Sequence, residues 1–149
     1  MNTLFERSLL VFEQQGIEQL QGVHVLVAGV GGVGGYVAEA LARAGVGQLT
    51  LIDHDDVSGS NLNRQIIALN STLGCNKAEV MASRIADINP ECKVIINKQF
   101  IRPADMESLL ATDYDYVVDA IDSLNCKAAL VVSSVKRGLP IVSSMGAGR

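Results

Sequence analysis

The sequence predicts an α/β protein with a doubly wound, mainly parallel sheet and helices on both of its faces. Short strand-like runs alternate with amphipathic helical segments along the whole chain. The run 23–28 has no polar alternation, which is typical of a central parallel strand that is buried on both faces. It ends directly in the glycine-rich turn 29–34, and a helical segment follows. This strand–turn–helix order predicts a Rossmann-like sheet.

The other elements are predicted from hydrophobic periodicity and from the Gly, Pro and Asn residues that interrupt it. The expected strands are 23–28, 48–52, 93–97, 116–119 and 141–144. The expected helices are 4–20 with a break at Gly16, then 35–44, 66–69, 77–89, 103–110 and 125–136. We expect an N-terminal helical segment over residues 1–22 and one nucleotide-binding domain over 23–149. The last expected strand has no covering helix after it, so we expect this domain to continue in a longer protein.

Composition and charge exclude several classes of protein. With 149 residues, of which 48% are hydrophobic and 19% charged, the chain fits one globular domain. A net charge of −4 and a pI of about 5.1 predict no overall basic surface for nucleic acid. The three cysteines form no CxxC pair, which argues against a disulfide framework and a zinc site. No segment resembles a signal peptide or a membrane span, so we expect a cytoplasmic protein with no membrane partner.

The glycine-rich turn predicts a nucleotide site. Gly29, Gly31 and Gly34 match the pattern GxGxxG, and Gly32 lies between them. In this pattern the first glycine permits a tight turn, the second lets phosphates approach the backbone, and the third lets the helix pack on the strand. The helix N-terminus then offers free N–H groups and a partial positive charge to an anion. A merely structural turn is the alternative.

Asp53 ends the second expected strand, where a carboxylate can accept hydrogen bonds from both ribose hydroxyls. A loop-capping aspartate is the alternative. Up to this point, a nicotinamide-dependent dehydrogenase fits the sequence equally well.

Polar residues after the second strand favour a different chemistry. Asp55, Asn61, Arg64 and Gln65 lie just beyond it, in the region where α/β proteins bind ligands, and a hydride-transfer site has no need of them. Arg64 and Lys77 supply two cations for a polyphosphate, as phosphoryl or nucleotidyl transfer requires. For any one of these residues alone, a solvated surface position is the alternative.

Two carboxylates, Asp119 and Asp122, follow the fourth expected strand. Because Mg²⁺ prefers one or two carboxylates together with phosphate oxygens, we expect Asp122 to bind it. Asp119 could be a second ligand or could cap the next helix. Cys126 is expected to be a packed thiol rather than a thioester nucleophile, because no histidine lies nearby in the sequence to activate it.

Taken together, these motifs resemble the adenylation domain of the ubiquitin-activating-enzyme-like (ThiF/MoeB) superfamily. The motifs are Gly29-x-Gly-Gly-x-Gly34, Asp53-x-Asp55-x-Val57, Asn61-x-Asn63-Arg64-Gln65, Gly74-x-x-Lys77, Ile88-Asn-Pro90 and Asp119-x-x-Asp122. Finer motifs resemble one branch, the tRNA threonylcarbamoyladenosine dehydratases. They are 38–47, 61–65, 77–81, 88–92, 119–123 and Ser144-Met-Gly-Ala147.

The resemblance implies ATP-dependent activation of the threonyl carboxylate on a modified tRNA adenosine, followed by cyclisation onto the carbamoyl nitrogen. It implies ATP and Mg²⁺ as cofactors and tRNA as a partner, and it leaves open a sulfur-carrier or sulfur-transfer partner. By position, the nucleotide would contact Gly29, Gly31, Gly32, Gly34, Asp53, Asp55, Asn61, Arg64, Gln65 and Lys77. The implied catalytic residues are Arg7, Arg64, Lys77 and Asp122, and the implied metal ligands are Asp122 and Asp119.

Arg7 resembles the arginine that reaches the triphosphate of the neighbouring subunit in homodimeric relatives, which implies a homodimer. An exposed helical arginine is the alternative. The zinc-binding CxxC pair of many such enzymes is missing from the sequence. Two other functions stay open: an adenylyltransferase for the C-terminal Gly-Gly of a small sulfur-carrier protein, and a non-catalytic nucleotide-binding or dimerisation module.

Overall fold

The structure, a computed structural model, describes residues 3–145. Residues 1–2 of the expected N-terminal segment lie outside this range, as do Gly146 and Ala147 of the last motif and the rest of the expected domain to 149. The helices are α1 (Leu9–Gln21), α2 (Gly34–Ala44), α3 (Lys77–Ile88), α4 (Met106–Leu109) and α5 (Leu124–Lys136). The strands are β1 (His24–Ala28), β2 (Gln48–Ile52), β3 (Lys93–Asn97), β4 (Tyr116–Asp119) and β5 (Ile141–Ser143). Short 3₁₀ turns cover Thr3–Phe5, Gly59–Asn61, Asn70–Thr72 and Pro103–Asp105.

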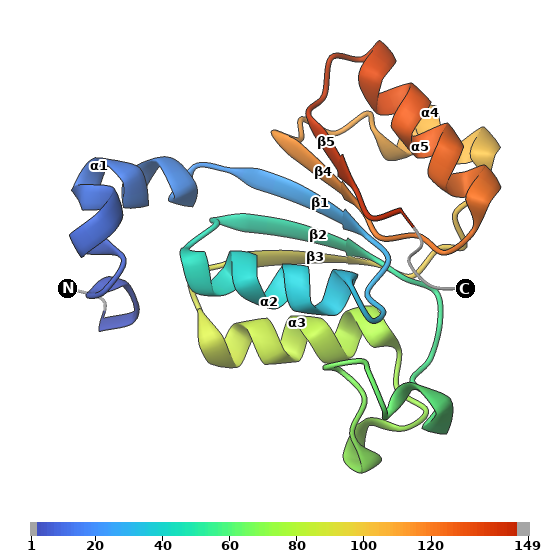
Figure 1. Cartoon of the computed structure of the whole chain (residues 1–149), viewed down its shortest axis with the longest axis horizontal. Helices are drawn as coiled ribbons and strands as arrows, with labels where there is room; N and C mark the ends of the chain where they lie inside the picture. Colours follow the sequence, from blue (N-terminus) through green and yellow to red (C-terminus); the bar gives the residue numbers. More distant parts are fainter. Residues whose placement is uncertain (1–2, 146–149) are drawn as a thin grey trace.

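The strands form one parallel sheet in the order β3-β2-β1-β4-β5, which confirms the predicted fold class. The central strand β1 pairs with β2 along its whole length and with β4 from Val25↔Tyr116 to Ala28↔Asp119. Helices α2 and α3 cover one face of the sheet, and α4 and α5 cover the other (Figure 1). The strand order therefore reverses at β1, with β2 and β3 on one side of it and β4 and β5 on the other. In sheets of this kind ligands bind in a crevice at the point of reversal, so a crevice is expected at the carboxyl ends of β1 and β4.

Side-chain alternation along the strands divides the core into two clusters. On one face, Val27 and Leu51 pack with Met81 of α3, and all three are fully buried. On the other face, Leu26 packs with Leu130 of α5. Burial of this apolar surface is the main term that holds the helices on the sheet. None of the helices within residues 3–145 is long and apolar enough to cross a bilayer.

The N-terminal helix differs from its predicted form. Instead of running from residue 4 with a break at Gly16, α1 begins at Leu9 and is interrupted at Glu13, which has φ 57° and ψ 178°. A Cβ on Gly16 would lie 2.9 Å from the Cβ of Phe12. Gly16 therefore leaves space for the Phe12 side chain, but the helix is interrupted at Glu13, three residues before Gly16.

The predicted short helix at 66–69 is wrong, because this segment forms turns. The hydroxyl of Thr72 accepts a hydrogen bond from the Leu69 N–H and donates one to the Ile67 carbonyl oxygen, at 2.9 and 2.7 Å. Such side-chain bonds occupy backbone groups that a helix would need. The strands predicted at 48–52, 93–97 and 116–119 have the bounds expected, and β1, α2, α3, α5 and β5 each differ from the prediction by one residue at one end. The helix predicted over 103–110 is a 3₁₀ turn, Pro103–Asp105, followed by the short helix α4.

His24 begins β1 and is the one histidine of the core. Its side chain is 9% exposed, its Nε2 lies 2.8 Å from the Thr50 hydroxyl, and its ring meets that of Tyr114 edge-on at 4.7 Å. Burial lowers the pKa of His24, with a smaller lowering effect from Lys93 and an opposing effect from Asp115. The folded protein therefore holds this ring in its neutral form.

We expect acid to destabilise the protein through His24. As the pH falls below about 6.5, the unfolded chain binds a proton that the folded chain does not, so the free energy of unfolding decreases by up to ~1.4 kcal/mol per pH unit. Above that pH the contribution is constant. Urea unfolding at pH 7.5, 6.5 and 5.5 should show a steeper loss of unfolding free energy for the parent than for His24→Gln. Equal losses in the parent and His24→Gln would contradict this assignment.

Candidate active site

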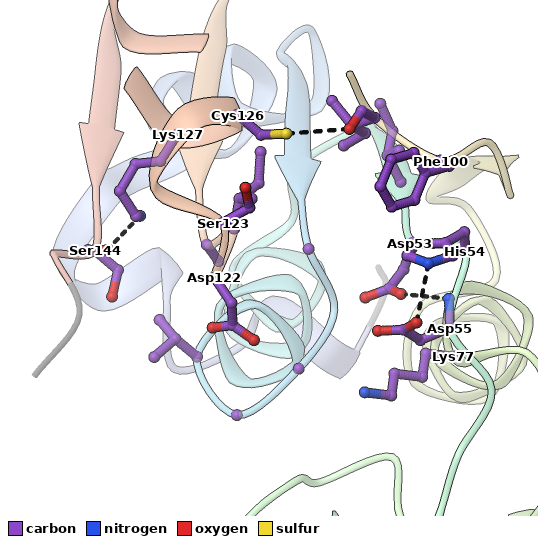
Figure 2. Close-up of a pocket in the computed structure, with 18 of the residues that line it drawn as sticks. Asp53, His54, Asp55, Lys77, Phe100, Asp122, Ser123, Cys126, Lys127 and Ser144 are labelled. Atoms are coloured by element: carbon purple, nitrogen blue, oxygen red, sulfur yellow. Dashed lines mark hydrogen bonds and ion pairs between the residues drawn. The ribbon is translucent and has the colours of Figure 1, made fainter. Parts of the chain in front are cut away.

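A cavity of about 880 Å³ opens at the carboxyl ends of the strands. Its wall contains nine of the predicted site residues: Gly29, Gly31, Gly32, Asp53, Asp55, Arg64, Gln65, Lys77 and Asp122. Asp122 lies on one wall and the side chains of Asp53, Asp55 and Lys77 on the other, with the glycine turn between them (Figure 2). Gly34, Asn61, Asp119 and Arg7 do not line it.

Two glycines of the turn are required by the protein itself. Gly29 has φ +91°, and a Cβ on it would lie 2.5 Å from the carbonyl oxygen of Ala120. A Cβ on Gly34 would lie 1.7 Å from the carbonyl oxygen of Gly29, which is an impossible distance. Gly34 thus allows α2 to start directly on the turn, and the N-terminal end of α2 points towards the cavity.

Gly31 and Gly32 are different, because the protein leaves room for a side chain at both. A Cβ on Gly31 would meet the Gln65 side chain at 3.5 Å, and one on Gly32 would meet that of Arg64 at 3.8 Å, both ordinary contacts. Packing within the chain therefore does not explain these two glycines. Their bare backbone leaves open the part of the cavity where a ligand can approach the N–H groups.

Asp53 connects the glycine turn to the end of β2. Its Oδ2 accepts a hydrogen bond from the Val30 N–H at 2.8 Å, and its Oδ1 accepts one from the Asp55 N–H at 2.9 Å. Each carboxylate oxygen keeps a further acceptor position, so a ribose hydroxyl can still bind. Beside it, His54 lies 3.1 Å from the Asp55 carboxylate and meets the ring of Phe100 edge-on at 4.7 Å.

Lys77 is the first residue of α3 and is only 7% exposed, yet it lines the cavity. Its backbone N–H donates to the Asp55 carbonyl oxygen at 3.0 Å, but its ammonium group has no ion-pair or hydrogen-bond partner within residues 3–145. An ammonium group that reaches a cavity and has no protein partner there is available to charge-assisted hydrogen bonds from an anion. The position of Lys77 therefore favours an anionic ligand in the cavity.

The polar segment 61–65 follows β2. Some of its side chains stabilise the loop itself, and others line the cavity. Arg64 is exposed at the cavity wall, and its guanidinium donates to the Ser60 carbonyl oxygen at 2.9 Å and to Asn63 at 3.1 Å. Asn61 is buried outside the cavity, where its side chain accepts a hydrogen bond from the Ser58 N–H at 2.9 Å. Gln65 is 7% exposed and lines the cavity, and its Oε1 has no partner among the described residues.

The two predicted metal ligands lie in opposite environments. Asp119 is fully buried; its Oδ1 accepts from the Ile121 N–H at 3.1 Å, and its Oδ2 accepts from Lys127 at 2.8 Å and from Ser143 at 2.5 Å. Asp119 does not fit a metal-ligand role, because protein donors already occupy its carboxylate. Nor does it cap α5, whose N-cap residue is Ser123.

Asp122 fits a metal site better. It is exposed, it lines the cavity, and no hydrogen bond or ion pair engages its carboxylate within the described part of the chain. A single carboxylate that can be joined by phosphate oxygens is a common arrangement for Mg²⁺. Of the two predicted ligands, the structure therefore leaves Asp122 available to a metal ion.

Arg7 lies apart from the cavity. It is exposed, in the turn before α1, and this segment packs by way of the Phe5 ring against Gly45, beside the amino ends of the strands (Figure 1). The structure therefore does not bring Arg7 to the site of its own chain, and a contribution from a neighbouring subunit stays a prediction.

The cavity also contains residues that the sequence analysis did not identify. Phe100 and Ile101 follow β3, Lys127 belongs to α5, and Ser144 follows β5. Their signal was positional: Phe100 and Ile101 come just after a strand, where ligands of parallel sheets bind. Cys126, also at the wall, is buried and its thiol donates to the Ile101 carbonyl oxygen at 3.1 Å, which agrees with the predicted packed thiol.

Known proteins are similar to this chain in both sequence and fold. The tRNA threonylcarbamoyladenosine dehydratase of Bacillus subtilis is 48% identical over 143 residues, which cover 96% of this chain and 56% of the relative. The crystal structure of the Escherichia coli tRNA N6-threonylcarbamoyladenosine dehydratase in complex with ATP has a TM-score of 0.94 at 44% identity and covers 97% of this chain and 59% of that one. The molybdopterin-synthase adenylyltransferase of E. coli is 35% identical, over 89% of this chain and 53% of that protein.

The chain thus spans little more than half the length of the relatives it matches. The sequence model of the ThiF family matches residues 5–149. The glycine turn, the cations and the exposed Asp122 all lie within that match. The chain belongs to the ThiF family.

Proposed function

We propose that this chain is the ATP-binding part of an enzyme that adenylates a carboxylate. The carboxylate proposed first is the threonyl group of tRNA threonylcarbamoyladenosine, which is then dehydrated by cyclisation. The observation that carries the proposal is the ammonium of Lys77, which has no partner among residues 3–145 and reaches a cavity that also holds Arg64, Asp122 and the bare backbone of Gly31. The relatives support it, since the similar E. coli enzyme has been solved with ATP and with AMP.

In this proposal Asp53 accepts the ribose hydroxyls, and the phosphates lie along the glycine turn between Lys77 and Arg64. An oxygen of the substrate carboxylate attacks the α-phosphorus, and the bond from that phosphorus to the bridging oxygen breaks. Pyrophosphate leaves with the electron pair, and the two cations stabilise its charge. Mg²⁺ held by Asp122 would neutralise phosphate charge.

The mixed anhydride has a good leaving group. The carbamoyl nitrogen of the same nucleoside then attacks the acyl carbon, AMP leaves, and the nitrogen loses a proton, so that the net change in the nucleoside is the loss of one water. Holding the two groups in attack geometry can supply roughly 7–11 kcal/mol, so this step needs positioning more than further chemistry.

The proposal extends to the assembly and its surroundings. As the family resemblance implies, Arg7 would reach the triphosphate of a second subunit in a homodimer; its exposed position away from the cavity of its own chain is compatible with this role. A tRNA substrate implies a cytoplasmic protein. Activation of a small sulfur-carrier protein is the second candidate, because the adenylyltransferase at 35% identity is a relative too.

The direct test uses the complete protein, ATP, Mg²⁺ and tRNA that carries threonylcarbamoyladenosine. Mass analysis of the nucleosides should show the loss of one water, only when ATP is present. An unchanged nucleoside would overturn the assigned substrate. Pyrophosphate exchange with a Gly-Gly-tailed carrier protein in its place would support the second candidate, and no exchange with either acceptor would leave a nucleotide-binding module.

Exchange of labelled pyrophosphate into ATP should depend on the acceptor and should fall by about 10²–10³-fold in Arg64→Ala and Asp122→Ala, because each removes charge stabilisation at the phosphates. Matched controls are Lys136→Ala and Asp87→Ala, which remove exposed charges of the same sign elsewhere. Exchange in Arg64→Ala and Asp122→Ala at the level of these controls would overturn both assignments.

Gly31→Ala and Gly34→Ala should separate binding from folding. The new Cβ at Gly31 meets only ordinary contacts in the chain, so the free energy of unfolding should change by less than about 0.5 kcal/mol. It would stand where phosphate approaches, and calorimetry should show ATP affinity lower by about tenfold or more, at least ~1.4 kcal/mol. Gly34→Ala should instead lose roughly 3 kcal/mol or more of stability, through overpacking. Unaltered ATP affinity in Gly31→Ala would contradict the phosphate position.

A further inference from the structure

Lys127 is a buried charge of the cavity wall that the proposed reaction does not use. It is 7% exposed, and its ammonium donates to the Asp119 carboxylate at 2.8 Å and to the Ser144 carbonyl oxygen at 2.6 Å. Ser143 donates to the same carboxylate oxygen, and the Ser144 N–H donates to the Asp119 carbonyl oxygen at 2.9 Å. The end of β4, the end of β5 and the start of α5 are therefore joined through one ion pair.

Stability alone does not account for this pair. Replacing a buried ion pair by apolar groups of similar size is often neutral or stabilising, because both charges lose their hydration. The position of Lys127 is also unfavourable, since it lies in the first turns of α5, where the helix dipole disfavours a cation. Desolvation and the helix dipole both make Lys127 unfavourable for stability. Its presence is better explained by the positions in which its hydrogen bonds hold β4, β5 and α5.

That geometry determines where Asp122 lies. The carboxylate of Asp122 has no partner within residues 3–145, so its position depends on the backbone on either side. On one side, the Ile121 N–H donates to the Asp119 side chain at 3.1 Å. On the other side, the Lys127 N–H donates to the Ser123 carbonyl oxygen at 2.9 Å. The loop that carries Asp122 is thus held at both ends by the two members of the ion pair.

The same pair also holds a second segment on the side of the cavity that carries Asp122. Ser144 and Met145 line the cavity beyond the end of β5, and Lys127 binds the carbonyl oxygen of Ser144 directly (Figure 2). One side chain therefore connects the wall that carries Asp122 with the segment that closes this side of the cavity.

We infer that Lys127, through its pair with Asp119, is a positioning residue that aligns Asp122 and the Ser144–Met145 segment for the adenylation step. The inference rests on the proposed function, in which Asp122 acts at the phosphates. Lys127 itself touches neither the nucleotide nor the acceptor in this scheme.

The test compares the complete parent protein with Asp119→Asn/Lys127→Met. The double variant removes both charges together, because Lys127→Met alone would leave Asp119 buried and unpaired and could unfold the protein. With the fold confirmed by its melting curve, kcat for acceptor-dependent pyrophosphate exchange should fall about 10²-fold, since small misplacements at a reacting centre have effects of this size. The KM for ATP should stay within about threefold, because Asp53 and the glycine turn are untouched, and the Mg²⁺ concentration for half-maximal rate should rise.

Two controls keep this test specific. Lys127→Arg, which retains the charge and the donors, should recover most of the lost kcat, and Lys136→Met on the exposed far end of α5 should match the parent. Amide hydrogen exchange should be about tenfold faster at Ser144 and in the loop 120–123 of the double variant, and unchanged at Gly29, whose N–H donates to Ile52 at 2.9 Å.

A folded double variant with parental kcat and Mg²⁺ requirement, or with unchanged exchange at Ser144, would overturn the positioning role. A parent protein that exchanges no pyrophosphate would instead overturn the proposed function. In that case the amide exchange still decides whether Lys127 holds the two segments.

Discussion

The contact between Gly34 and the carbonyl oxygen of Gly29 is the constraint on which the site depends. Because no Cβ fits there, the chain can leave β1, turn and start α2 within six residues, 29–34. That turn carries the backbone of Gly31 to the cavity and brings the Val30 N–H within 2.8 Å of Asp53. This hydrogen bond connects Asp53 at the end of β2 to the turn at the end of β1. These two strand ends together form the wall of the cavity where we propose that the nucleotide binds.

Much of this could be predicted from the sequence because it depends on local patterns. Parallel strands that are buried on both faces, glycines at fixed spacing and carboxylates after strands each have a signal within a few residues. The turn 66–69 and the break at Glu13 could not be predicted in this way. In the first, the Thr72 hydroxyl occupies backbone groups that a helix would need, and the residue type alone does not say which groups a hydroxyl will bond. In the second, the glycine marks the region of the break, but the positive φ falls on Glu13, a residue type with no turn preference.

Asp119 and Asp122 show most clearly what the sequence alone could not predict. In the sequence they are two carboxylates three residues apart after a strand, and nothing local distinguishes them. In the fold, Asp119 is the last residue of β4 and points into the layer between the sheet and α5, whereas Asp122 lies in the loop and remains exposed. The difference arises from Lys127 and Ser143, which reach Asp119 from elements eight and 24 positions further along the chain. Tertiary partners, rather than residue type, decide which carboxylate is available to a ligand.

The strand order also has a consequence for biosynthesis. The central strand β1 needs β4 on one edge, and the hydrogen bond between His24 and Asp115 joins positions 91 residues apart. At about 5–20 residues per second, the ribosome needs roughly five to twenty seconds to make that intervening chain. During this time one edge of a buried and mostly apolar strand has no partner and is open to pairing with other chains. The glycine turn can form early, but the wall that carries Asp122 is completed last, so a nascent chain acquires the two sides of its cavity in a fixed order.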